Sequence, residues 1–125
     1  MSVPHLASLP DHYHGKPYGD GHCVALVRAL SSLPATTHWR RGDPVAGSTL
    51  APGTIVATFN HHGRYVNDIG GASHAAVLLA EHEDGSITVF DQWLGQEPHQ
   101  RVIRNRKGVG HAVNDASRFY AVEVA

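Results

Sequence analysis

The chain has 125 residues, of which 42% are hydrophobic and 17% charged, and 10 Lys and Arg against 11 Asp and Glu give a formal net charge of −1. This composition excludes a disordered tail, and no apolar run approaches the roughly 18–20 residues of a membrane-spanning helix. Without a basic stripe, a nucleic-acid or anionic-membrane surface is not expected. We predict a single domain over residues 1–125.

The beginning of the chain does not resemble a secretory signal. Residues 1–10 lack both a positively charged segment and a continuous apolar segment. The lone cysteine, Cys23, cannot form an internal disulfide, and the sequence holds no CxxC motif. We therefore expect synthesis in the cytoplasm without a cleaved signal peptide.

The first regular element that the pattern predicts is a helix over residues 22–30. Residues 1–21 are rich in Pro, Gly, His and Tyr, which is typical of a loop. Apolar side chains then recur at i, i+3, i+4 and i+7, the spacing of one buried helix face: Cys23, Leu26, Val27 and Leu30. Pro34 marks the end of this helix, and residues 35–50 are predicted to form a loop.

The rest of the chain predicts strands. Six segments combine β-branched, aromatic and other apolar residues in strand-like patterns: 54–59, 64–66, 74–80, 86–93, 101–104 and 119–124. The dipeptide Asp84-Gly85 between two of these segments is a hairpin signal. An N-terminal helix that carries the cysteine, packed on an antiparallel sheet of about five or six strands, makes the expected fold class α+β.

Cys23 is the candidate nucleophile. It lies at the predicted first turn of the helix, where unpaired N–H groups and the positive end of the helix dipole favour a thiolate. The same N–H groups can hold a developing oxyanion. The alternative is a small apolar cysteine buried on the helix face, with no chemical role.

A cysteine nucleophile needs a base, and His74 is the best candidate. It begins the most apolar strand, so its ring is expected at the mouth of a cleft at the sheet edge. The alternative is an exposed histidine at the strand end. His61 and His62 are weaker candidates because they lie in a predicted turn, where their position would be loose.

Asp91 is the candidate residue that orients the base, because it interrupts an apolar strand that follows His74. Its alternative role is that of a strand-end residue bonded to a loop. If Asp91 does not orient the histidine, Asn67 or Asp68 are the next candidates.

Strand register gives this pair a geometric test. A tight turn at Asp84-Gly85 would leave His74 and Asp91 on one face but four positions apart, about 13 Å at ~3.3 Å per residue. That distance is too long for a hydrogen bond. We therefore predict a longer loop centred nearer Glu83, or a bulge, that brings Asp91 opposite or diagonal to His74, with Gln92 on the other face.

These motifs together resemble a known superfamily. Tyr18-Gly19-Asp20-Gly21-His22-Cys23 resembles the Y-x-x-G-x-C segment of CHAP domains. The single helix, the strand from His74 and Val89-Phe90-Asp91-Gln92-Trp93 are similar to the wider papain-like NlpC/CHAP superfamily. Within it, the chain most resembles small stand-alone bacterial proteins of the type VI secretion amidase effector kind, over about residues 18–93.

The resemblance implies a papain-like NlpC/CHAP fold and a cysteine attack on an amide bond, commonly in peptidoglycan stem peptides. The roles of nucleophile, base and orienting residue then fall on Cys23, His74 and Asp91, with no cofactor or metal. It further implies type VI secretion into a rival's periplasm, with a cognate immunity protein as a partner, or else release as a phage-type lysin.

The chain departs from the superfamily at its oxyanion donors. Many CHAP sequences have Gln directly before the cysteine, where this chain has His22, and the upstream glutamine of papain-like enzymes is also missing. His22 or the Tyr18 side chain remain candidates for the second donor. We expect Tyr18, His22 and Trp93 to bind substrate. Tyr65 and Trp39 are further groove candidates, with packing in the core as the alternative.

Two other functions fit the same residues. Transglutaminases and glutamine deamidases also order Cys, His and Asp in this way, and they act on proteins. A non-catalytic binding domain is the third alternative. His12-Tyr13-His14 and His61-His62 hint at metal, but they lack the convergent spacing of a metal site. A monomer is the default expectation.

Overall fold

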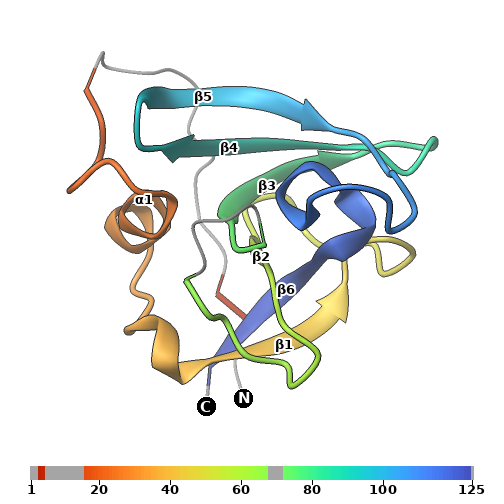
Figure 1. Ribbon diagram of the computed structural model, residues 1–125, viewed down its shortest axis with the longest axis horizontal. Coiled ribbons are helices and arrows are strands. Elements are labelled where there is room, and N and C mark those ends of the chain that lie inside the picture. Colours follow the sequence, from red (N-terminus) through yellow and green to blue (C-terminus); the bar gives the residue numbers. More distant parts are fainter. Residues whose placement is uncertain (1–2, 5–15, 68–71, 125) are drawn as a thin grey trace.

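The computed structural model describes residues 3–4, 16–67 and 72–124. This part of the chain forms one α-helix, three short 3-10 turns and six strands (Figure 1). Their bounds are α1 (Cys23–Leu30), η1 (Thr36–His38), β1 (Trp39–Pro44), β2 (Ile55–Thr58), β3 (Ala75–Glu81), β4 (Ile87–Trp93), β5 (Gln96–Ile103), η2 (Ala112–Asn114), η3 (Ala116–Arg118) and β6 (Phe119–Val124). The strands make one antiparallel sheet in the order β1-β6-β2-β3-β4-β5. The predicted α+β class, with the cysteine-bearing helix on an antiparallel sheet, is confirmed.

The core lies on both faces of the central strands. On one face, α1 packs on β3 and β4 (Figure 1), where Leu26 and Val27 of the helix join Val77 and Phe90 in one apolar cluster. On the other face, a second cluster gathers around Phe119. All four residues of β2 are buried, which explains why its sequence runs Ile-Val-Ala-Thr without the alternation of a half-exposed strand.

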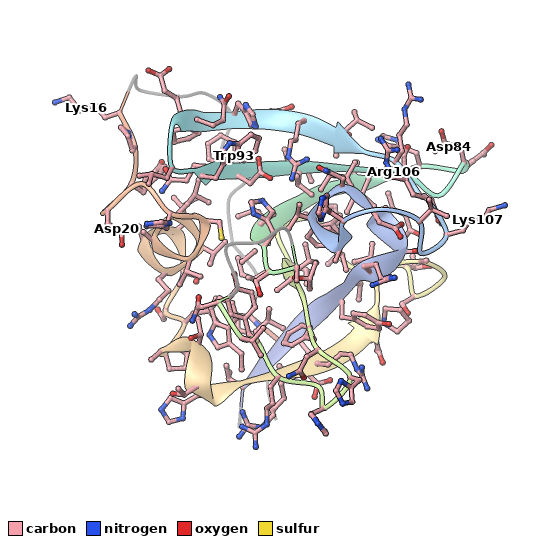
Figure 2. All side chains as sticks on the ribbon, viewed as in Figure 1. Lys16, Asp20, Asp84, Trp93, Arg106 and Lys107 are labelled. Atoms are coloured by element: carbon pink, nitrogen blue, oxygen red, sulfur yellow. The ribbon has the colours of Figure 1, made fainter. Side chains whose placement is uncertain are left out.

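The edges of the molecule are polar. Charged side chains such as Lys16, Asp84 and Lys107 project outward from the periphery (Figure 2). Among the described helices, none has the length and apolar character needed to cross a membrane.

Two predicted elements are wrong. Residues 64–66 are not a strand, because the Asn60 carboxamide oxygen accepts from the His62 and Arg64 N–H groups and shapes a turn there. Within the predicted loop 35–50, residues 39–44 form β1, an edge strand paired with β6. Its sequence contains two Arg, Gly, Asp and Pro, residues that only an edge strand tolerates together, so the strand has no hydrophobic signal.

The β3–β4 hairpin contains the irregularity that the register argument requires. Glu81 pairs with Ile87, but beyond a register shift between Leu78 and Ala80 the pairing becomes Val77 with Phe90. This shift confirms the predicted bulge. The hairpin turn is also longer than two residues, since the His82 N–H donates to the carbonyl of Ser86 across it.

Candidate active site

Two glycines shape the turn that precedes α1. Gly19 (φ +54°) and Gly21 (φ +89°) have left-handed backbones. A Cβ on Gly19 would lie 2.8 Å from the Ala25 Cβ, so the close approach needs a glycine there. The turn delivers Cys23 to the first position of the helix. His22 at the N-cap is extended and its side chain makes no capping bond, which leaves first-turn N–H groups beside the thiol.

Gln92 fixes this turn to the sheet. Its side chain is fully buried, and its oxygen accepts from the Tyr18 N–H at 2.8 Å. Its amide nitrogen donates to the carbonyls of Tyr18 and His22, each at 2.8 Å. As predicted, Gln92 faces away from Asp91, toward the helix. Sequence reasoning gave it no further role, because only the three-dimensional structure brings the turn beside β4.

His74 and Asp91 meet at the start of β3. The Thr58 hydroxyl oxygen accepts from the His74 N–H at 3.0 Å, and the His74 carbonyl accepts from the Thr58 N–H at 3.0 Å, so the backbone of His74 is held on both sides. The His74 Nε2 lies 2.7 Å from the Asp91 Oδ2, and both side chains are buried. Because Nε2 is engaged by Asp91, Nδ1 is the ring nitrogen left to face the thiol.

Hydrogen bonds and neighbouring charges favour an ion pair between Cys23 and His74, against the effect of burial. Burial opposes ionisation of the thiol, but the hydrogen bond and charge of His74, together with the Tyr65 hydroxyl and the Ala75 N–H, lower the pKa of Cys23. Burial opposes the charged imidazole as well, yet hydrogen bonds and charges from Asp91 and Cys23 raise the pKa of His74 to about 9. Both shifts favour a thiolate on Cys23 beside an imidazolium on His74.

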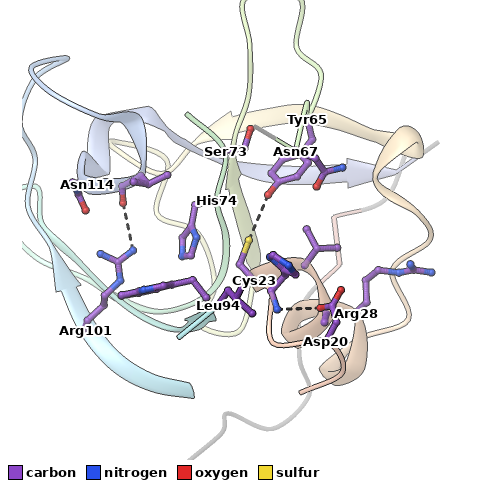
Figure 3. Close-up of a pocket in the computed structure, with 15 residues that line it drawn as sticks. Asp20, Cys23, Arg28, Tyr65, Asn67, Ser73, His74, Leu94, Arg101 and Asn114 are labelled. Carbon is purple, nitrogen blue, oxygen red and sulfur yellow. Dashed lines mark hydrogen bonds between the residues drawn. The ribbon is translucent and has the colours of Figure 1, made fainter. Parts of the chain in front are cut away.

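Tyr65 touches the sulfur directly. Its hydroxyl lies 3.5 Å from the Cys23 Sγ (Figure 3). The ring is held by Trp39, at 5.0 Å between centroids, and by Phe59, at 6.4 Å. Burial, followed by the charge of the thiolate, raises the pKa of Tyr65, so this hydroxyl stays protonated and donates to the sulfur. The sequence marked Tyr65 only as a groove candidate, since a lone aromatic in a turn carries no sign of a contact with a cysteine.

Two basic residues of β5 lie beside Asp91 and were missed from the sequence. The Arg101 Nε donates to the Asp91 Oδ2 at 2.8 Å, and the His99 Nε2 lies 3.2 Å from the Asp91 Oδ1. Burial would raise the pKa of Asp91, but His74 and Arg101 together lower it, so the carboxylate is ionised. The strand was predicted to begin only at Arg101, so its register against Asp91 could not be derived.

A cavity of about 840 Å³ opens onto the thiol and the imidazole. Its walls come from the start of α1, the turn after β2, the β4–β5 hairpin and η2, as the close-up shows (Figure 3). Of the predicted substrate-binding residues, His22 and Trp93 line it, and so does Tyr65. Tyr18 instead packs against the apolar core. Trp39 is fully buried, so packing in the core, and not the groove, is its role.

The other candidates named from the sequence lie elsewhere or outside the described residues. Asn67 lines the cavity, but its amide donates to the Thr36 hydroxyl at 2.9 Å and not to His74. Asp68 and His12-Tyr13-His14 lie outside the described residues. The rings of His61 and His62, in the turn after β2, lie with their centroids 3.9 Å apart and their planes tilted by 42°. In the described part of the chain, no group of three or more His, Cys, Asp or Glu side chains is arranged to hold a metal ion.

Residues 4–122 match the family model of domesticated amidase effector 2. The chain belongs to this family. It is also similar to a solved structure, type 6 secretion amidase effector 2 (Tae2), with 25% sequence identity, a TM-score of 0.74 and coverage of 93% of this chain and 96% of that one. No curated protein matches the chain. Family membership confirms the expected resemblance to amidase effectors and favours an amidase over the deamidase and binding-domain alternatives.

Proposed function

We propose that the chain hydrolyses an amide bond of peptidoglycan peptides, with Cys23 as nucleophile, His74 as base and acid, and Asp91 as the residue that orients the imidazole. The observation that carries this proposal is a thiol at a helix start and an imidazole that line one cavity, with a buried carboxylate hydrogen-bonded to the imidazole. Membership of an amidase effector family supports the same chemistry.

In the first half of the reaction, the Cys23 thiolate attacks the carbonyl carbon of the bound peptide. The carbonyl electrons move to oxygen, and the N–H groups at the start of α1 face the negative charge that develops. The His74 imidazolium then gives its proton to the leaving amine as the C–N bond breaks. The products of this half are a free amine and a thioester on Cys23.

In the second half, neutral His74 takes a proton from a water molecule, and the resulting hydroxide attacks the thioester carbonyl. The C–S bond breaks, the peptide acid leaves, and the thiolate and imidazolium form again. Asp91 stabilises the imidazolium in both halves and keeps Nε2 protonated, so that Nδ1 exchanges the proton.

The second oxyanion donor has two candidates beside the sulfur. His22 lines the cavity next to Cys23, whereas the Tyr18 backbone is bound to Gln92 and its side chain packs inward. The Tyr65 hydroxyl is an O–H donor at 3.5 Å from the Sγ. Tyr65 therefore replaces Tyr18 in our proposal, together with His22.

The cavity has the size and lining that a peptide needs. Apolar and aromatic surface from Trp93 and Leu94 lies on one wall, and Asp20 and Asn67 add polar groups. Such a lining holds an extended peptide by contact area and orients it through a few polar bonds.

We also propose that the chain is delivered by type VI secretion into the periplasm of a target cell. A cognate immunity protein that protects the producing cell is the expected partner. Membership of an amidase effector family and similarity to Tae2 support this proposal.

Digestion of purified sacculi tests the function. Sacculi are incubated with four proteins: the wild-type chain, Cys23→Ala, His74→Ala and a matched control, His82→Ala in the β3–β4 turn. The masses of the products are measured by mass spectrometry. We expect peptide products from wild type and His82→Ala, and none from the other two. Cleavage by folded Cys23→Ala would contradict the proposal, and a gain of one mass unit on a glutamine of an added protein would identify a deamidase instead.

A further inference from the structure

The carboxylate of Asp91 has more basic neighbours than a simple triad needs. It is fully buried. One oxygen, Oδ2, accepts hydrogen bonds from both the His74 Nε2, at 2.7 Å, and the Arg101 Nε, at 2.8 Å. The other oxygen, Oδ1, lies 3.2 Å from the His99 Nε2 without the geometry of a hydrogen bond. Arg101 and His74 therefore share a single acceptor atom.

Arg101 is held firmly in this position. Asp91 pairs with His99 across β4 and β5, which places Arg101 two residues further along the same face of β5. Its Nη2 donates to the Val113 carbonyl at 3.4 Å. Its guanidinium also lies over the Trp93 ring, 5.1 Å from the centroid. These contacts fix the fork of the guanidinium while one face of the residue lines the cavity.

We propose that Arg101 is a positioning residue for amide cleavage, which fixes the Asp91 carboxylate and takes up part of the negative charge that His74 would otherwise receive. This inference rests on the proposed function, because it assigns Arg101 a task in the same proton transfer. Arg101 acts through Asp91 and does not touch the reacting atoms.

The charges around the site show why this sharing matters. His74 faces the Cys23 thiolate from α1 and the Asp91 carboxylate from β4, while the neutral Tyr65 hydroxyl lies against the Cys23 sulfur. Asp91 in turn faces His74, and His99 and Arg101 from β5. The thiolate and the Asp91 carboxylate are balanced by the imidazolium of His74 and the guanidinium of Arg101. Removing Arg101 leaves an excess negative charge next to the imidazolium, which then holds its proton more tightly.

The test compares Arg101→Gln and Arg101→Lys with wild type. Arg104→Gln is the matched control, because Arg104 is exposed just after β5 and is not part of the cavity wall. For each variant, kcat and KM on a soluble cell-wall peptide are measured from pH 5 to 11, and the melting temperature is measured in parallel. The alkaline limb of the rate profile reports the proton on His74.

We expect Arg101→Gln to move the alkaline limb upward by about 0.5–1 pH unit, less than the ~1–3 units caused by a directly adjacent charge, because Arg101 acts on His74 through Asp91. Its kcat should fall roughly tenfold, with KM little changed, because a pKa shift of one unit corresponds to a factor of ten in proton affinity. Arg101→Lys keeps the charge and should keep the limb at the wild-type position, with kcat about threefold lower because one donor replaces the fork. Arg104→Gln should match wild type.

An alkaline limb of folded Arg101→Gln at the wild-type pH would overturn the inference, whatever happens to kcat, because a purely structural role predicts that result. If Arg101→Gln does not fold, the test uses Arg101→Lys instead. A kcat of Arg101→Lys equal to that of wild type would then overturn the inference. The proposed function fails separately, if Cys23→Ala or His74→Ala still cleave sacculi.

Discussion

Two carboxylates of this chain, Asp91 and Asp115, are both fully buried, and they are stabilised in opposite ways. Asp115 accepts from the backbone N–H groups of Arg106, Gly108 and Ser117 and from the Ser117 hydroxyl, at 2.7–3.0 Å. Asp91 is instead bound by the basic side chains of His74 and Arg101.

The difference lies in the chemistry of the donors: Asp115 is bound by groups that do not titrate, and Asp91 is bound by the candidate base. Backbone donors do not titrate, so Asp115 fixes the loop that leads from β5 to β6 and keeps a constant charge environment. The partners of Asp91 include an imidazole that loses and regains a proton, and one of its oxygens lacks a hydrogen bond among the described residues. Burial of a carboxylate therefore does not mark a functional site by itself; the chemistry of its donors does.

Among the changes at these two carboxylates, Asp91→Ala is expected to have the largest effect on activity. This change leaves Arg101 and His74 buried without their anion, so we expect the imidazolium to be lost and kcat to fall about 10³–10⁴-fold, as for other triad carboxylates. The measurement is kcat on a cell-wall peptide, with the folded fraction taken from circular dichroism. Asp91→Asn is the matched variant and should lie between Ala and wild type. A folded Asp91→Ala protein with a kcat within tenfold of wild type would contradict the role of Asp91.

The structural side of the comparison is tested by Asp115→Asn. The amide nitrogen of Asn would face the Gly108 N–H, which loses its acceptor, so we expect a loss of about 2–3 kcal/mol in the free energy of unfolding. Urea unfolding measures this loss, and Asp43→Asn, at an exposed carboxylate, is the control with a change below about 0.5 kcal/mol.

The stabilisation that Asp115 provides depends on pH. Burial would raise its pKa, but hydrogen bonds from Ser117, Arg106 and Gly108 lower it. The stabilisation is therefore present above the unfolded-state pKa of about 3.9 and is lost as the pH falls through the lower folded-state value. Equal unfolding free energies for wild type and Asp115→Asn at pH 7 would contradict this assignment.

A smaller effect is expected at Tyr65. Tyr65→Phe keeps the ring against Trp39 and removes the donor to the sulfur, so the pKa of Cys23 should rise and kcat should fall about fivefold, the value of one hydrogen bond of ~1 kcal/mol. Tyr120→Phe, on the half-buried β6 ring, is the control. Identical thiol titrations for wild type and Tyr65→Phe would show that the hydroxyl does not act on the sulfur.

The helix and the apolar strands could be predicted because burial of one or both faces requires apolar residues at regular spacing in their own sequence. The Cys23, Leu26, Val27 and Leu30 spacing faces β3 and β4, and β6 was predicted with its observed bounds. The edge strand β1 could not be predicted, since an edge strand with one polar side needs no hydrophobic repeat. The bulge in β3 was predictable only because an ideal hairpin would have separated His74 from Asp91.

Contacts that depend on long-range register stayed hidden. Arg101 and His99 reach Asp91 because β5 begins at Gln96, and nothing in the local sequence indicates that start. Tyr65 reaches Cys23 from a turn shaped by Asn60, and its neighbour Trp39 lies on the strand that was missed. Sequence patterns therefore named the three side chains to which we assign the reaction, whereas the residues that contact them depend on the tertiary fold.

The most direct test of the account is the rate at which iodoacetamide alkylates Cys23 as the pH is varied from 4 to 10, in wild type and in His74→Ala. Burial alone would raise the pKa of this thiol, and His74 reverses that effect. We expect an inflection below pH 9 for the wild type, and an inflection that moves to pH 9 or above in His74→Ala. A wild-type inflection at pH 9 or above, or one that the His74→Ala change leaves in place, would contradict a thiolate held by the imidazolium of His74.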